Sequence, residues 1–417
     1  MAEAVERPET LVIDESKRTK DSVMATTLIG AHGFEHMYAH SFPVLVTAIY
    51  ESLGLDPIQA GVLSTVRSLT GGLTSIFSGF FVDIFKYRSG QVLAISMGLI
   101  GLGYFLVAIS PNYIAILGAL VVASAGSSLW HPPALGLLAQ RYPKQRGLYL
   151  SLHRSTGNVG DLAGPLIAGG LLGILGWRWI MGGGTPMLLA LGVAVLVLLW
   201  NVGGPKPERI DVRLKMKTQM RSLGEAFQGT GMWSIFLVSA VRGMGDRAYV
   251  FFLPFYLRQE LGMGFFMVSV HVALVAAPGI IGGPFFGVLS DRVGRRSVIA
   301  FLMLVAVVLS LTTALAGGGI GMTVSIALFG LFHSSVNSLT QAAAIDEAEG
   351  KGLDSTFMGL MWGSNAAFSA VAGAGVGVLI KFYGWEIAFY FAAVMFFLGL
   401  VVTLAMPRKR TSQPQIT

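Results

Sequence analysis

The sequence predicts an all-α membrane protein with twelve transmembrane helices, arranged as two pseudo-symmetric halves of six helices each. Of its 417 residues, 53% are hydrophobic and only 12% are charged, whereas about a quarter of the residues in an ordinary soluble domain are charged. The apolar residues fall into stretches of about 20 residues, the length that an α-helix needs to cross a bilayer. Short motifs also recur at one constant offset, close to half the chain length.

The apolar stretches predict helices rather than barrel strands. Strands of a membrane barrel alternate between apolar and polar residues, but a run such as 187–200 is apolar at almost every position. The first 20 residues are polar and lack the apolar core of a signal peptide, so the first span is expected to remain in the protein. The predicted spans are 22–50, 57–83, 91–110, 112–139, 147–174, 179–201, 230–257, 265–290, 297–316, 320–345, 355–380 and 386–406.

Basic residues outside the spans indicate the orientation. Most lie in the two terminal tails and in the loops that follow even-numbered spans, while only Arg178, Arg258 and Lys381 fall on the opposite side. Cytoplasmic segments carry the excess of Lys and Arg, so both termini are expected in the cytoplasm. The net charge of +7 then reflects topology, and no nucleic-acid partner is expected. The predicted location is a multi-pass position in a bacterial inner membrane.

Internal repetition divides the chain into two halves. The matched motifs are Gly54 with Gly262, Gly79 and Asp83 with Gly287 and Asp291, and Gly176-Trp177 with Gly384-Trp385. Parallel six-helix repeats that enclose a central solute site are typical of transporters in which one half rocks against the other. The expected organisation is a tail at 1–21, a first half at 22–201, a cytoplasmic linker at 202–229, a second half at 230–406 and a tail at 407–417.

The loop after the eighth span runs from Gly287 to Arg296 with the sequence GVLSDRVGRR. It resembles the signature loop of the major facilitator superfamily, and this resemblance implies the major facilitator fold and alternating access. An Asp beside an Arg at a helix end can form a pair in one state and lose it in the other, although such charges can also simply anchor helix ends. The expected latch residues are Gly79, Asp83, Gly287, Asp291, Arg292, Gly294 and Arg295. The first-half copy lacks the second glycine.

Within that superfamily the chain resembles the fosmidomycin-resistance type of efflux protein. The motifs that carry the resemblance are GSSLWHP at 126–132, His32, and STGN at 155–158 followed by Gly164-Pro165. The resemblance implies a proton-coupled antiporter that exports a drug-like or phosphonate-like compound and confers antibiotic resistance. Glycines in the fifth span also follow an antiporter pattern approximately. Pro133 and the Glu35-His36 pair depart from the family pattern and leave the substrate open.

Ionisable residues within membrane spans are costly and usually mark a pathway. In the first span, Glu35 lies among His32, His36 and His40. A carboxylate among imidazoles can exchange protons near neutral pH, so Glu35, His32 and His36 are the expected proton-coupling residues. Asp161 is a further candidate, although Arg154 on its own helix would favour its charged form.

Imidazoles with a carboxylate could alternatively bind a transition metal. Three histidines spread over two turns of one straight helix cannot all reach a single ion. No resident metal and no cofactor are therefore expected, while metal transport stays open as an alternative.

Polar and aromatic residues in other spans predict a solute site. Arg154 could bind an anionic group, Arg242 and Asp246 are one turn apart and can pair, and Arg247 is expected to point elsewhere. This mixture suits an amphiphilic or anionic solute. The expected solute-binding residues are His40, Trp130, His131, Arg154, Asn158, Arg242, Asp246, His333, Asn337, Trp362 and Asn365.

The expected partners are a small-molecule solute, protons and the lipid bilayer, and the expected oligomeric state is a monomer. No nucleophile elbow, Walker loop or zinc-ligand spacing occurs, so the chain is not expected to be an enzyme. An importer or metal-ion permease on the same fold and a non-transporting receptor or scaffold remain as alternatives.

The charge distribution predicts that tags fused to either end of the chain stay on the cytoplasmic side. Protease or antibody added to sealed cells should reach neither tag, and permeabilised cells should expose both. Access to either tag in sealed cells would contradict the orientation.

Overall fold

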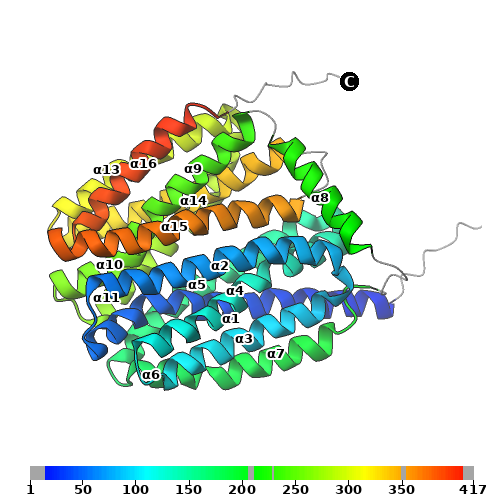
Figure 1. The fold of residues 1–417 in the computed structure, drawn as a ribbon, viewed down its shortest axis with the longest axis horizontal. Coiled ribbons are helices and arrows are strands. Elements are labelled where there is room, and N and C mark those ends of the chain that lie inside the picture. Colours follow the sequence, from blue (N-terminus) through cyan, green and yellow to red (C-terminus); the bar gives the residue numbers. More distant parts are fainter. Residues whose placement is uncertain (1–14, 205–210, 228–229, 349–353, 407–417) are drawn as a thin grey trace, which may run out of the picture.

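The computed structural model describes residues 15–204, 211–227, 230–348 and 354–406, which are almost entirely helical and contain no strand. Figure 1 shows two helical bundles side by side, the first half below and the second half above. The first half consists of α1 (Glu15–Leu53), α2 (Pro57–Ile84), α3 (Ser89–Ile109), α4 (Tyr113–Arg141), α5 (Arg146–Leu172), α6 (Trp177–Gly183) and α7 (Thr185–Leu199), with short 3₁₀ turns η1 (Lys86–Arg88) and η2 (Pro143–Gln145).

The second half begins after a separate helix, α8 (Val212–Ala226), in the connecting segment. Its elements are α9 (Thr230–Asp246), η3 (Arg247–Phe251), α10 (Phe252–Phe255), η4 (Tyr256–Glu260), α11 (Phe265–Ala276), α12 (Gly279–Val293), α13 (Arg295–Leu315), α14 (Gly319–Ala348), α15 (Asp354–Tyr383) and α16 (Ile387–Thr403). When consecutive elements are joined end to end, each half contains six long helical rods, which follow the predicted spans within a few residues except at the start of α1.

Several local features differ from the sequence expectation. Helix α1 begins at Glu15, inside the predicted tail, and α8 forms within the predicted linker. The sixth rod breaks at Gly184, where an added Cβ would collide with the Tyr38 hydroxyl. The seventh rod contains two π-helical segments, η3 and η4. Such bulges change which side chains face a cavity, and hydropathy alone does not reveal them. The tails at 1–14 and 407–417 lie outside the described residues.

The outer surface of the bundle suits contact with lipid. Seven helices within the described residues are long and apolar enough to cross a membrane by length and composition. Large apolar side chains such as Ile114, Ile281 and Leu315 are more than two-thirds exposed. Apolar exposure on this scale is rare on soluble monomers, but lipid tails cover it without cost in a membrane.

Glycine geometry supports the internal repeat. Gly54 ends α1 and Gly262 follows η4, and their φ angles of 60° and 64° belong to the left-handed region. Gly294 has a φ of 94° at the turn between α12 and α13. Glycine adopts these angles without the steric cost that a side chain would impose. The two halves therefore make the same turn after their first rod, whereas the turn at Gly294 has no positive-φ counterpart among the described residues of the first half.

Close contacts between helices explain the glycines of the fifth span. A Cβ at Gly160 would lie 2.3 Å from the Gly33 carbonyl oxygen, and one at Gly164 would lie 2.2 Å from that of Met37, so both glycines let α5 pack directly on α1. Gly169 instead faces Ser269 on α11 in the other half, while Gly170 has open space. This pattern is that of small-residue helix packing.

Two ion pairs join the halves at the end of the bundle opposite the termini. Arg258 donates to both carboxylate oxygens of Glu51, at 2.6 and 3.2 Å, and Lys381 donates to Asp56 at 3.0 Å. The pKa of Asp56 lies below its usual range because the backbone N–H of Gln59 and the Lys381 ammonium stabilise the carboxylate. Asp56 therefore stays charged at neutral and mildly acidic pH. These are the only ion pairs between halves within the described part of the chain.

Removing the bidentate pair should favour the state that opens at this end. An exposed pair contributes about 1 kcal/mol or less, so Arg258→Ala should raise the population open at that end by up to about fivefold. The chain has no cysteine, so one introduced cysteine can report how open the cavity is. Ser128 lines the central cavity, and the rate at which Ser128→Cys reacts with a membrane-impermeant thiol reagent applied from that side measures the access. The swapped variant Glu51→Arg/Arg258→Glu should restore much of the closure. Unchanged labelling in Arg258→Ala would show that the pair does not hold this end shut.

Candidate functional site

A cavity of about 500 Å³ lies between the two halves. The first half contributes side chains from α1, α2, α4 and α5, and the second half contributes side chains from α9, η3, α14 and α15. Polar and apolar side chains both line the cavity, and a single carboxylate, that of Asp246, lies there beside four arginines and three histidines. A solute in this cavity would touch both halves, and its contacts would change when one half moves.

Three of the cavity arginines, Arg67, Arg154 and Arg247, have no carboxylate within ion-pair distance among the described residues. Arg67 on α2 donates to the backbone oxygen of Ala39 at 2.6 Å and lies over the ring of Phe42. Arg154 on α5 is exposed to the cavity. Arg247 opens the π-helical segment η3, and its buried Nε has no hydrogen-bond partner among the described residues. The centre of the molecule therefore carries uncompensated positive charge.

The second half holds a charged network that is already paired. Arg242 donates to Asp246 one turn later on α9, and His333 on α14 donates from Nδ1 to the same carboxylate at 2.7 Å. Arg242 also donates to the side-chain oxygen of Asn337 at 3.1 Å. The pairing of Arg242 with Asp246 agrees with the sequence expectation. This network fixes donors from two helices around the cavity.

The structure brings most of the expected solute-binding residues to this cavity. His40, His131, Arg154, Arg242, Asp246, His333, Asn337, Trp362 and Asn365 all line it. Trp362 on α15 meets His131 on α4 edge to face, with ring centroids 5.6 Å apart, so these two residues connect the halves directly.

Two expected residues lie elsewhere. Trp130 is fully buried in the core, and Asn158 is not part of the cavity lining. Trp130 points about 100° away from its neighbour His131 around α4, into the core, while His131 faces the cavity. Asn158 is one turn beyond Arg154, where α5 packs against α1.

Sequence reasoning left two cavity arginines out of the site. Arg67 was not assigned to it, and Arg247 was expected to point elsewhere, but both line the cavity. Their position within membrane spans was the available signal, because an unpaired cation there is costly. Arg247 comes four residues after Gly243, which also lines the cavity, so the regular turn of α9 already brings it to that face.

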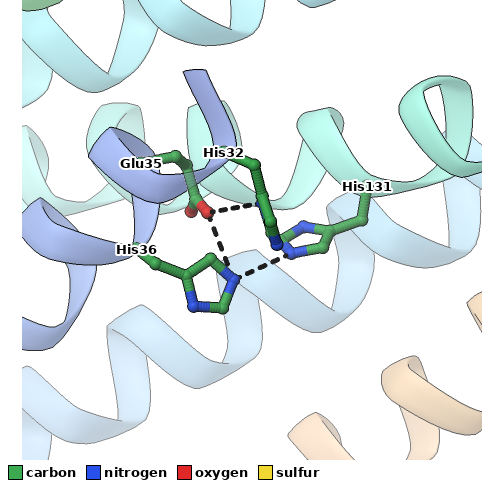
Figure 2. Close-up of side chains that lie close together, drawn as sticks. All are labelled: His32, Glu35, His36 and His131. Atoms are coloured by element: carbon green, nitrogen blue, oxygen red, sulfur yellow. Dashed lines mark hydrogen bonds and ion pairs between the residues drawn. The ribbon is translucent and has the colours of Figure 1, made fainter. Parts of the chain in front are cut away.

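The candidate proton-coupling residues form a cluster beside the cavity. Glu35 accepts a hydrogen bond from Ser127 on α4. Asp161 on α5 accepts a hydrogen bond from His36 Nδ1 at 2.5 Å and lies within ion-pair distance of His40 Nε2, at 3.1 Å. The imidazoles of α1 therefore partner Asp161, and no ion pair joins Asp161 to Arg154 among the described residues. Figure 2 shows Glu35 with His32, His36 and His131 around it.

His153 on α5 also belongs to this cluster, and sequence reasoning missed it. Its ring stacks on that of His32, with centroids 3.7 Å apart. His271 on α11 lies apart from this cluster, buried and hydrogen-bonded to Met267 and Thr323.

The latch loop of the second half has the expected turn at Gly294, and Asp291 and Arg295 form an ion pair within the loop, at 3.4 Å. Arg292 is exposed in the last turn of α12, and Gly79 and Gly287 lie within helices. The side chain of Asp83 lies outside the described residues. The role of this loop as a conformational latch remains a prediction.

Two helical bundles around a shared polar cavity define a membrane transport protein. A sequence profile of the Major Facilitator Superfamily matches residues 29–370 and, in an overlapping match, 235–417. The chain belongs to this superfamily and is a transporter rather than an enzyme.

Similar proteins agree with this membership. The chain is 26% identical to the fosmidomycin resistance protein of Escherichia coli, over 65% of this chain and 67% of that protein. It is 24% identical to an uncharacterised transporter of Bacillus subtilis, over 89% and 91%, and 25% identical to a putative glycerol-3-phosphate transporter of Arabidopsis thaliana, over 71% and 67%. A bacterial homologue of the human lysosomal transporter Spinster, in an inward-facing and unoccupied conformation, shares the fold with a TM-score of 0.70 at 14% identity, over 94% and 99% of the chains.

Proposed function

We propose that this chain exports a small anionic or amphiphilic compound in exchange for protons, by alternating access. The excess of arginines over carboxylates in the cavity between the halves carries this proposal. A desolvated guanidinium fork binds phosphate, phosphonate or carboxylate oxygens in pairs. The trapped solute would partly neutralise charge that the protein leaves uncompensated.

Relatives and orientation support export. The fosmidomycin resistance protein and a multidrug resistance protein B homologue of Mycobacterium tuberculosis, 31% identical over 34% of this chain, are named for resistance to compounds. The putative glycerol-3-phosphate transporter is named for an anionic phosphate ester. With cytoplasmic termini, the ion pairs Glu51–Arg258 and Asp56–Lys381 would close the external end. The described state would then be ready to receive solute from the cytoplasm of a bacterial cell.

Proton exchange would take place in the cluster beside the cavity, with Glu35, His32, His36 and Asp161 as carriers. Glu35 is 1% exposed, and its Oε2 has no hydrogen-bond partner among the described residues. Burial disfavours the charged form of a carboxylate, so such a group can take up or release a proton when its surroundings change. Since His131 contacts both this cluster and the cavity, solute binding and protonation would influence each other.

Arg154→Lys should weaken binding of anionic solutes by about tenfold or more, because lysine keeps the charge but loses the fork that forms charge-assisted pairs. Binding of glycerol 3-phosphate and of glycerol to purified protein would compare an anionic with a neutral compound of similar shape. Arg178→Lys is the control, because Arg178 binds backbone oxygens of Ala108 and Ser110 outside the cavity. Equal loss for both compounds would assign Arg154 a structural role.

Glu35→Gln should abolish uphill transport driven by a pH gradient while it retains solute counterflow. Glutamine keeps an oxygen for Ser127 but cannot carry a proton. Reconstituted vesicles with and without an imposed gradient would measure both activities. Glu260→Gln, at an exposed position, should behave like the wild type. Uphill transport at the normal rate by Glu35→Gln would move the carrier elsewhere, with Asp161 the next candidate.

A further inference from the structure

Most of the histidines of the chain gather in one place. Five of the seven histidines and two carboxylates form one cluster between α1, α4 and α5 in the first half. The members of this cluster are His32, Glu35, His36, His40, His131, His153 and Asp161. Proton exchange needs one or two such groups. The density of potential metal ligands calls for a further explanation.

Four of these side chains direct one ligand atom each toward a common point (Figure 2). His36 Nε2 lies 3.4 Å from His131 Nε2 and 3.5 Å from Glu35 Oε2, and His32 Nδ1 lies 3.7 Å from the same oxygen. All four ligand atoms lie within 4.8 Å of one another. A tetrahedral ion with bonds of about 2.0–2.1 Å separates its ligands by about 3.3–3.4 Å. Three of the contacts are already near this spacing, and the remaining ligand atoms, all within 4.8 Å of one another, must draw closer to coordinate an ion.

Two of the four ligand atoms are buried without a hydrogen bond. His32 and Glu35 are each 1% exposed, and His32 Nδ1 and Glu35 Oε2 have no hydrogen-bond partner among the described residues. Their mutual distance of 3.7 Å is too long for a hydrogen bond. Leaving such groups unsatisfied in the interior is destabilising. A cation between them would satisfy both.

Neighbouring residues orient the ligands as in known metal sites. His36 donates from Nδ1 to Asp161 at 2.5 Å, so its Nε2 is unprotonated and presents a lone pair, which faces His131 Nε2 at 3.4 Å and could coordinate an ion instead. A carboxylate behind a ligating imidazole is the usual outer-shell arrangement. Ser127 holds the other oxygen of Glu35, and His153 stacks on the ring of His32.

The packing also leaves room for the rings and a route for an ion. An added Cβ at Gly157 would lie 2.7 Å from His32 Nε2 and 3.4 Å from His36 Cε1, so glycine at this position admits both imidazoles. His131 belongs both to the ligand set and to the lining of the central cavity. An ion could therefore enter from the cavity past His131.

We infer that His32, Glu35, His36 and His131 bind one divalent transition-metal ion of the zinc class within the first half of this transporter. Three imidazoles and one carboxylate suit Zn²⁺ or Co²⁺. The sequence argued against a single site because the three histidines of α1 span two turns. The structure resolves this objection, because His131 from α4 completes the set and His40 turns to Asp161 instead.

The site shares residues with the proposed proton pathway, so metal and protons compete. Coordinating groups must be deprotonated, and metal binding therefore releases protons and weakens as the pH falls. Bound Zn²⁺ should inhibit proton-driven transport.

The test is a titration of purified full-length protein, prepared with a tag that contains no histidine, with Zn²⁺ and Co²⁺ alone. Calorimetry should give one ion per chain, and the visible spectrum of bound Co²⁺ should report tetrahedral coordination. His32→Phe and Glu35→Gln should each lower the affinity by more than 100-fold, and Asp161→Asn should lower it by about 10–100-fold, as expected for an outer-shell residue.

Matched variants separate ligand loss from misfolding. His153→Phe keeps the ring stack on His32 and should retain the wild-type affinity within a few-fold, as should His271→Gln on α11. Thermal unfolding without metal should be similar for His32→Phe and His153→Phe.

Failure of wild-type protein to bind either ion, or equal losses in His32→Phe and His153→Phe, would overturn the inference. Neither result would affect the proposed anion transport, because solute binding is measured separately with the Arg154 variant. Loss of anion selectivity would likewise leave the metal titration valid.

Discussion

The cost of burying charge in a membrane governs the arrangement of this protein. A bilayer offers no water to ionisable side chains, so each one must face a polar cavity or find a partner. Arg67, Arg154 and Arg247 face the cavity, Arg242 pairs with Asp246, and the imidazoles of α1 pair with Asp161. Because the cavity exists only where the two halves meet, the polar chemistry of the molecule is concentrated at the surface that must change during alternating access.

The two halves share one architecture but differ in how their buried charged side chains are paired. In the second half, Asp246 is committed to Arg242 and His333, so that region is a fixed scaffold of donors. In the first half, Glu35 and His32 keep unpartnered atoms, and no arginine holds Glu35 in an ion pair within the described residues. A side chain without a fixed partner can gain or lose a proton or a metal ion more readily. The proposed solute contacts therefore involve both halves, and the proposed proton and metal sites only the first.

Helix packing connects these regions. Gly160 and Gly164 bring α5 against α1, so the backbones that carry Asp161 and the histidines cannot shift independently. The same helix presents Arg154 to the cavity and Gly169 to Ser269 in the other half. Interfaces packed this closely repack between discrete arrangements and do not deform smoothly. Helix α5 is therefore placed to transmit occupancy of the cavity to the cluster and to the interface.

The sequence by itself determined the helices, the repeat and most cavity residues, because hydropathy and repetition are properties of local composition. It identified Glu35 and the histidines of α1 as unusual, since polar groups in apolar spans stand out. Tertiary structure decided which of them meet. His131 and His153 join the cluster from other helices, Asp161 partners His36 on another helix, and the cavity takes in Arg247 as well as its neighbour Asp246. These outcomes depend on the rotation and packing of one helix against another, which a one-dimensional pattern does not contain.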